Sequence, residues 1–245
     1  MFGERIKNDG DGISNKKVYK EICKQLGTGL FGGISVRSML KATELTLIHM
    51  EISDISFLKY FPNLESLTLC NNKIDNLGPV KDLKKLKVLN IDINNIFDLE
   101  PLSSLTTLIE VEAEENRISN IYPLRNLLNL ESLGMGNNKI SDISAISNLN
   151  NLVYINFEGN NVKDISDIRS LVNLEEIDMN MNEIEDISPL VKLSKLTFVF
   201  FNNNKIKDLS HLINLVGLSD ADFTNNPLEK IDWKAKLSHI DELLI

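Results

Sequence analysis

The sequence predicts an α/β solenoid, a horseshoe of stacked coils with a parallel β-sheet on its concave side and short 3₁₀ or helical turns on its convex side. Each repeating unit carries apolar residues that a single coil cannot bury alone. Residues 1–41 lack the repeat and are expected to form an N-terminal helical cap. Leucine recurs at one constant interval without insertion or deletion, at Leu64, Leu86, Leu108, Leu130, Leu152, Leu174, Leu196 and Leu218, and Ala42 stands one interval earlier.

Every unit follows, with small variations, the pattern L-x-x-L-x-L-x-x-N-x-I-x-D-I-x-x-L-x-x-L-x-x, whose positions we number 1 to 22. This is the pattern of leucine-rich repeats, whose period lies between about 20 and 29 residues. Positions 4 and 6 have the period of a β-strand, so both side chains point inward and the residue between them points outward. Equivalent strands of successive coils are expected to pair in parallel, about 4.8 Å apart.

Asparagine occupies position 9 in every unit except the first, which has Met50 there. A buried amide offers two donors and an acceptor, and leaving the backbone groups of a turn unpaired costs about 1–3 kcal/mol each. We therefore predict that this asparagine column is structural, and that none of its members binds a ligand. The column consists of Asn72, Asn94, Asn116, Asn138, Asn160, Asn182, Asn204 and Asn226.

Position 13 carries aspartate or asparagine in units 1 to 8, from Asp54 to Asp208. We predict that these side chains cap the short turn that follows. One carboxylate per coil does not form the oxygen cage that calcium requires. The run Asp9-Gly10-Asp11-Gly12 looks like a calcium loop, but the aligned first and twelfth ligands would be Lys7 and Val18, so we interpret it as a flexible turn.

The expected organisation is a cap over residues 1–41, repeats over 42–228 and a C-terminal cap over 229–245. The repeats start at 42, 64, 86, 108, 130, 152, 174, 196 and 218. Lys16 to Leu26 has helical spacing of apolar residues. At the other end, a short amphipathic closing helix is suggested by Trp233, Leu237, Ile240, Leu243 and Leu244.

Positions 3, 5, 7 and 8 of each unit should point away from the core on the sheet side, and we call these 36 positions the concave face. Eleven of them are acidic and none is Lys or Arg. Like charges side by side destabilise a sheet. Exposed aromatic residues with a charged surround are typical of protein-binding hot spots. The alternative is that the acidic face aids solubility and that the phenylalanines cover an end near the cap.

We predict a non-enzymatic module that binds a protein or peptide with a basic surface across units 4 to 9. The aromatic anchors would be Phe198, Phe200 and Tyr154, with Met181 beside them. The predicted acidic contacts are Glu110, Glu112, Glu114, Glu158, Glu176, Asp178, Asp220 and Asp222. The alternative function is an intracellular regulatory subunit that docks on an enzyme such as a phosphatase.

Composition narrows the classes of partner and compartment. The net charge of −9 disfavours nucleic acids and anionic membranes. No apolar run is long enough to span a bilayer, and residues 1–30 show no signal peptide, which predicts a cytoplasmic protein. The alternative is a secreted or cell-surface protein if a leader was trimmed.

Two cysteines, Cys23 and Cys70, are not a disulfide framework. We expect a monomer.

Catalytic motifs and cofactor signatures are not found. His49 and Cys70 fall on adjacent strands of the concave face, where a thiol beside an imidazole can act as a nucleophile or as half of a metal site. The sequence supplies neither an oxyanion hole nor a pocket for them, so we predict that the chain is not an enzyme and has no metal or cofactor.

Two segments carry a resemblance to known proteins. The entry Ile34-Ser35-Val36-Arg37-Ser38-Met39-Leu40, which leads into Ala42 to Leu47, resembles the entry of an internalin repeat domain. The phrase Asn137-Asn138-Lys139-Ile140-Ser141-Asp142-Ile143-Ser144 is also typical of internalins. The units are similar as well to the leucine-rich regulatory subunit of protein phosphatase 1. The resemblance implies binding of a protein on the concave face. Internalins are exported, whereas this chain shows no export signal.

Overall fold

The N-terminal part is a helical cap. The computed structural model describes residues 5–6, 13, 15–27 and 33–245, so Asp9-Gly10-Asp11-Gly12 lies outside the described residues. Helix α1 (Lys16–Gln25) begins after Asn15, whose side-chain oxygen accepts from the N–H groups of Lys17 and Val18. It lies within the segment of predicted helical spacing, and its buried residues are Val18, Tyr19, Ile22 and Cys23. Strands β1 (Arg5–Ile6) and β2 (Ile34–Ser35) pair antiparallel before helix α2 (Val36–Met39).

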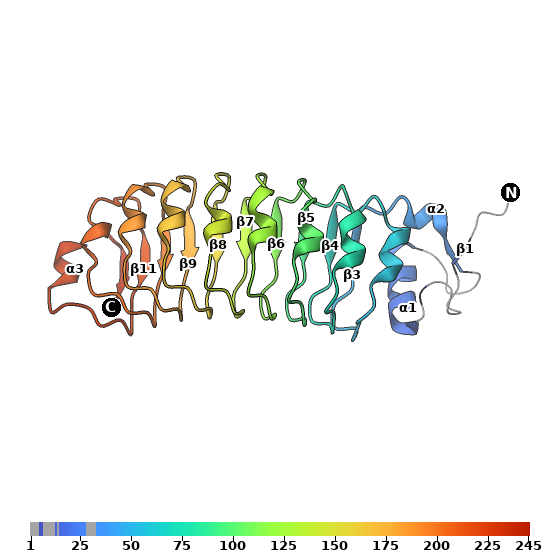
Figure 1. Cartoon of the computed structure of the whole chain (residues 1–245), viewed down its shortest axis with the longest axis horizontal. Helices are drawn as coiled ribbons and strands as arrows, with labels where there is room; N and C mark the ends of the chain where they lie inside the picture. The colour runs from blue at the N-terminus through green and yellow to red at the C-terminus, as the bar shows by residue number, and fades with distance from the viewer. Residues whose placement is uncertain (1–4, 7–12, 14, 28–32) are drawn as a thin grey trace.

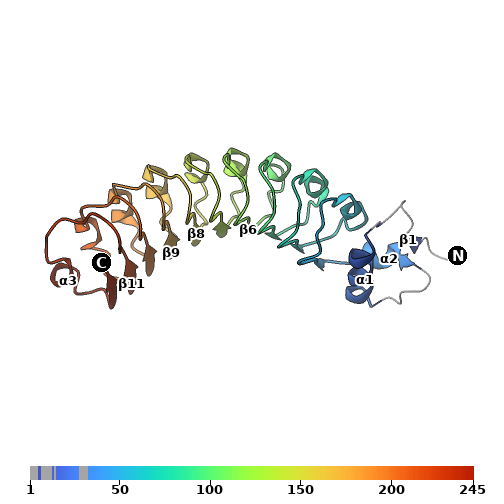
Figure 2. The same cartoon turned by 90° about the horizontal axis from the view of Figure 1, so that it is seen from below.

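The rest of the chain forms a curved solenoid with an open parallel sheet (Figures 1 and 2). Each strand pairs with the equivalent strand of the next unit, residue for residue, as the repeat predicts. The sheet lines the concave side in Figure 2 and the 3₁₀ turns line the convex side. Its ten strands, in spatial and chain order, are β3 (Glu44–Thr46), β4 (Ser66–Thr68), β5 (Val88–Asn90), β6 (Glu110–Glu112), β7 (Ser132–Gly134), β8 (Tyr154–Asn156), β9 (Glu176–Asp178), β10 (Phe198–Phe200), β11 (Asp220–Asp222) and β12 (Glu242–Leu244).

Short 3₁₀ helices follow the strands on the convex side. In units 1 to 8 the side chain at position 13 accepts a hydrogen bond from the N–H two residues later, as between Asp54 and Ser56 at 2.8 Å and between Asp208 and Ser210 at 2.8 Å. Position 13 therefore satisfies the first N–H of the turn, as predicted, although it stands one residue before the N-cap, which is an Ile or Leu such as Ile55. The eight helices are η1 (Ser56–Tyr60), η2 (Gly78–Asp82), η3 (Glu100–Leu102), η4 (Tyr122–Asn126), η5 (Ser144–Ile146), η6 (Ser166–Ser170), η7 (Ser188–Lys192) and η8 (Ser210–Leu212).

One continuous apolar core runs through the solenoid, and the asparagine column lies along its side. Asn138 shows the arrangement. Its Oδ1 accepts from the N–H of Ile118 in the preceding coil, and its Nδ2 donates to the carbonyls of Ala113, Met135 and Gly136 at 2.9–3.1 Å. Each amide thus joins two coils, which confirms the structural interpretation of position 9.

Position 8 adopts the left-handed backbone conformation in all nine units, with φ between 49° at Glu115 and 64° at Gly159. Asparagine and glycine tolerate this region; asparagine occupies the position in four units and glycine in one. Ile93, with φ of 52°, is the β-branched exception. The chain turns here from the strand toward the asparagine column, so the residue at position 8 stands at the edge of the concave face.

The C-terminal end differs from the expected closing helix. Helix α3 is only four residues long (Trp233–Lys236), and Leu243 and Leu244 lie in strand β12, which pairs parallel with β11. The sequence contained the signal, because Ile240 lies one full period after Leu218 and Leu243 lies one full period after Ala221. The repeat register therefore continues into a tenth strand, and Glu242 joins the concave face.

Candidate protein-binding surface

Eleven of the twelve predicted contact residues lie on the sheet side: nine are outward residues of the strands, and Glu114 and Glu158 stand two residues after a strand ends. The aromatic residues occupy positions 3 and 5 of two units. Phe198 lies between Glu176 and Asp220 of the neighbouring strands, and Phe200 lies between Asp178 and Asp222. Phe198 is 38% exposed and Phe200 is partly buried. Both phenyl rings are thus flanked by carboxylates on two sides.

Tyr154 and Met181 lie apart from the phenylalanines. Tyr154 is separated from Phe198 by Glu176, since β8, β9 and β10 are successive strands. Met181 is exposed, but its backbone N–H donates to the carbonyl of Asn202, beyond the end of β10. It therefore lies at the edge of the concave face and not directly beside Phe198. The structure brings together Phe198, Phe200 and the acids around them.

Part of the acidic face has a structural role that the sequence analysis missed. In four units a side chain at position 5 accepts the backbone N–H at position 7, which takes no part in the strand pairing. In units 4 and 8 the position-7 side chain of the preceding unit, Asp92 or Asn180, accepts it instead. Asp178 accepts from the N–H of Asn180 and Asp222 from that of Thr224, both at 2.9 Å. Asn90 and Asn156 do the same in their own units. The recurrence of aspartate and asparagine at position 5 was the available signal.

Three concave acids, Glu110, Glu158 and Glu176, have no such partner in the described residues. No Lys or Arg of the described residues forms an ion pair with an acid of the concave face, because all the ion pairs there involve Glu21, Glu51, Glu65 or Glu183. Glu110, Glu158 and Glu176 also accept no side-chain hydrogen bond within the described part of the chain. Their charge faces solvent uncompensated.

Unit 4 contains the most perturbed carboxyl group. Burial, together with the charges of Asp92, Glu110 and Glu114, raises the pKa of Glu112 to about 7, although Ser132 Oγ donates to its Oε1 at 3.1 Å and opposes the shift. Glycine on β7 allows this placement. Gly134 lies beside Glu112 in the sheet, and any side chain at 134 would collide with the glutamate carboxylate. Glu112 thus lies over the neighbouring strand.

The pKa values of three further groups on this part of the concave face are also raised. Burial is the main cause that raises the pKa of Asp178 to about 6, and Glu158, Glu114 and Glu176 contribute. Burial and the charges of Glu112 and Glu114 raise the pKa of Tyr154 to about 12. Burial likewise raises the pKa of Glu114, whose Oε1 accepts from Asn156 Nδ2 across β7 at 2.7 Å. Ionisation of these groups is therefore unfavourable in the middle of the concave face.

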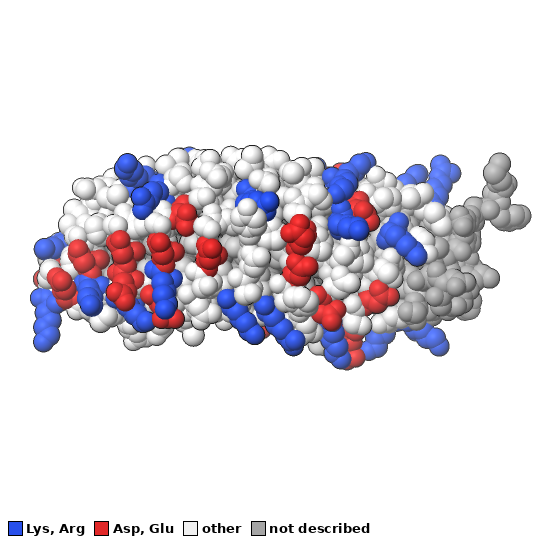
Figure 3. All heavy atoms as spheres, viewed as in Figure 1, with Lys and Arg blue, Asp and Glu red and all other residues white. Residues whose placement is uncertain are grey.

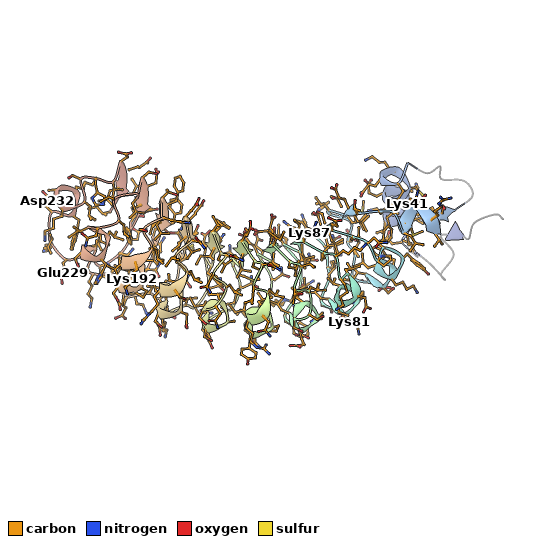
Figure 4. All side chains as sticks on the ribbon, turned by 90° about the horizontal axis from the view of Figure 1, so that it is seen from above. Lys41, Lys81, Lys87, Lys192, Glu229 and Asp232 are labelled. Atoms are coloured by element: carbon orange, nitrogen blue, oxygen red, sulfur yellow. The ribbon has the colours of Figure 1, made fainter. Side chains whose placement is uncertain are left out.

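The convex face differs in its charge. Figure 3, in the view of Figure 1 with the 3₁₀ turns toward the viewer, shows lysines and arginines interspersed with acids. Lys81 and Lys192 lie on this side in Figure 4. Lys87 lies at the start of β5, where its Nζ is 2.7 Å from Glu65 Oε2. Basic side chains therefore occupy the convex side and the flanks.

His49 and Cys70 are neighbours, since the N–H of His49 donates to the carbonyl of Cys70 at 3.2 Å. Burial and the charges of Asp92 and Glu115 raise the pKa of Cys70, which disfavours the thiolate that a nucleophile requires. Within the described residues, no cluster of three or more His, Cys, Asp or Glu side chains is arranged to hold a metal ion. None of the described helices combines the length and apolarity needed to cross a bilayer.

Comparisons with known proteins agree with this architecture. The family model described as Leucine Rich repeats (2 copies) matches residues 150–192 and 172–214. No curated protein matches the chain. An internalin of Listeria monocytogenes, InlF, is similar with 30% identity and a TM-score of 0.84, and the match covers 95% of this chain and 75% of that one.

Two further structures are similar. Internalin C2 of Listeria monocytogenes shares 27% identity and a TM-score of 0.83, with 86% of this chain and 94% of that chain covered. A leucine-rich repeat protein of Leptospira interrogans shares the fold, with 20% identity and a TM-score of 0.74. The match covers 86% of this chain and 62% of that one. On the repeat register, the fold and the likeness to InlF, the chain belongs to the internalins, a family of leucine-rich repeat proteins.

Proposed function

We propose that the chain is a non-enzymatic binding module that holds a protein or peptide with a basic surface on its concave face, across units 4 to 9. One observation carries this proposal: the concave face is acidic without cationic partners in the described residues, and Phe198 and Phe200 stand between its carboxylates. Leucine-rich repeat proteins are in general protein-interaction modules, and their extended curved surface is the part they use.

The physical argument joins charge and apolar area. Uncompensated carboxylates attract a basic partner and steer its approach, while they repel nucleic acid and anionic lipid. Aromatic side chains supply contact area at low cost in conformational entropy and are enriched in hot spots. A monomer with no cofactor suffices for this function, because one protomer presents all of these residues.

The first experiment compares protein capture by the wild type and by a Phe198→Ala/Phe200→Ala double variant with an unchanged circular dichroism spectrum. Both side chains point away from the core, so we expect the variant to fold and to lose the partner. The affinity of the captured partner for the wild type should fall as NaCl is raised, because exposed opposite charges are screened.

A matched control uses aromatic residues that the sheet does not carry. Phe97 and Tyr122 are exposed, at 61% and 59%, and lie outside the concave face. The Phe97→Ala/Tyr122→Ala variant should capture the partner as the wild type does. Equal capture by the Phe198/Phe200 variant would place the site elsewhere, and an affinity that does not depend on salt would remove the acidic face from the proposal.

A further inference from the structure

The concave face is not uniform, because a depression of about 260 Å³ lies at its C-terminal end. It is formed by the last three strands of the sheet, which Figure 2 shows at the end of the arc. Two of its lining residues are the phenylalanines of the proposed hot spot. The lining consists of Phe198, Phe200, Asp220, Ala221, Asp222, Glu242 and Leu244.

The register of the strands explains why a depression forms here. Outward side chains at position 3 follow the order Phe198, Asp220, Glu242, and the row at position 5 contains Phe200, Asp222 and Leu244. In both rows a short aspartate on β11 lies between longer side chains on β10 and β12. Strand β11 therefore forms a floor, and its neighbours form two walls about 4.8 Å away on either side.

The walls and floor differ in chemistry. One wall is aromatic and the other combines Leu244 with the exposed carboxylate of Glu242. The floor carries two carboxylates that are held in place. Asp222 accepts from the N–H and Oγ1 of Thr224 and from Nδ2 of Asn202, and Asp220 accepts from Oγ of Ser219. No Lys or Arg in the described structure forms an ion pair with these three acids.

We propose that this depression receives an arginine side chain of the bound protein. A guanidinium group is planar, stacks on aromatic faces and carries five donors in a fixed fork. The phenyl rings would contact its flat face and its aliphatic stem, while Asp220, Asp222 and Glu242 would accept its N–H groups in charge-assisted hydrogen bonds. A lysine ammonium offers a point charge and no stacking plane. This inference rests on the proposed function and names the partner chemistry at one subsite.

The test uses small probes, so that it does not depend on identifying the partner. N-acetyl-arginine amide is titrated into ¹⁵N-labelled chain and followed by the amide resonances of Val199, Ala221 and Leu243, which lie behind the depression. We expect saturable chemical-shift changes at these three amide resonances. The uncharged isostere N-acetyl-citrulline amide should bind about tenfold more weakly, because its side chain has lost the charge. N-acetyl-lysine amide should also bind more weakly than the arginine probe.

Variants locate the interaction. Glu242→Gln should weaken binding of the arginine probe several-fold, and Phe200→Ala should weaken binding of all three probes. The charge-matched control is Glu44→Gln, in β3 at the opposite end of the same sheet, which should leave the titration unchanged. Equal binding of citrulline, equal binding of lysine, or no saturable shift at these resonances would each overturn the assignment to arginine.

The two proposals can fail separately. If the arginine probe fails while a basic partner is still captured through Phe198 and Phe200, only the subsite assignment is wrong. If the probe binds as expected but capture does not depend on these phenylalanines, the subsite stands and the function proposed for the concave face does not.

Discussion

At the scale of single residues, the carboxylates of the concave face are of two kinds. Asp178 and Asp222 accept backbone N–H groups of their own units, so part of their role is to complete the fold. Glu110, Glu158 and Glu176 have no such role in the described structure, which leaves their charge available to a partner. Glu112 combines burial with the proximity of other acids, which raise its pKa to about 7, so that its ionised form is unfavourable in the folded chain.

The stability of the protein should depend on Glu112 in a defined pH window. The pKa of Glu112 is about 7 in the folded chain, above the usual value of 4.5, so the folded state binds more protons between these values and stability falls as pH rises from about 4.5 to 7. Glu112→Gln should therefore raise the free energy of unfolding by about 1–2 kcal/mol near pH 8, after allowance for solvent screening at this partly exposed site, and change it little near pH 4.

Urea unfolding at both pH values measures this effect. Ser132→Ala serves as the control of opposite sign, because it removes the hydrogen bond that stabilises the charged form of Glu112, and should lower stability mainly at high pH. A Glu112→Gln variant that gains the same stability at both pH values would show that packing, not ionisation, is responsible.

At the scale of elements, the strands and the 3₁₀ turns could be predicted because each is repeated many times. The end of the chain was predicted less well. The apolar residues from Trp233 to Leu244 were interpreted as a closing helix, although Ile240 and Leu243 keep the repeat register. A helical spacing and a strand spacing overlap in so short a segment, and pairing with β11 decides between them.

The fold role of position 5 can be separated from its charge in strand β9. Asp178→Ala should lower the free energy of unfolding by about 1–3 kcal/mol, because the N–H of Asn180 loses its acceptor. Asp178→Asn should be tolerated, since Asn90 and Asn156 serve the same position in other units. Denaturant unfolding near neutral pH distinguishes the two. If Asp178→Asn lowers the free energy of unfolding as much as Asp178→Ala does, the fold would require the carboxylate charge itself.

At the scale of the whole molecule, each coil packs against its direct neighbours, and the asparagine column joins successive coils. The hydrogen bond between Glu114 and Asn156 across β7 additionally joins units 4 and 6. Stability in such a solenoid is a sum of units and interfaces, so a defect in the middle and one at an end should act differently. Asn138 lies near the centre and makes four hydrogen bonds, whereas Asn226 lies near the end and is less buried.

Asn138→Ala should therefore lower the free energy of unfolding by at least about 3 kcal/mol, because several backbone groups lose their hydrogen-bond partners at once. Hydrogen exchange should accelerate on both sides of unit 5 and divide the solenoid into two parts. Asn226→Ala should accelerate exchange only in the last coils. A uniform acceleration in both variants would mean that the solenoid unfolds as a single unit and that the nearest-neighbour description does not apply.

The sequence by itself determined the period, the core, the asparagine column, the capping turns and which residues point outward from the strands, because each depends on local pattern or on a residue type repeated at one position. The tertiary structure decided which concave residues meet. Only the strand register places a short Asp220 between Phe198 and Glu242, and only the lack of a side chain at Gly134 lets Glu112 lie over β7. These contacts join residues of different coils, so their energies depend on neighbours that no single repeat contains.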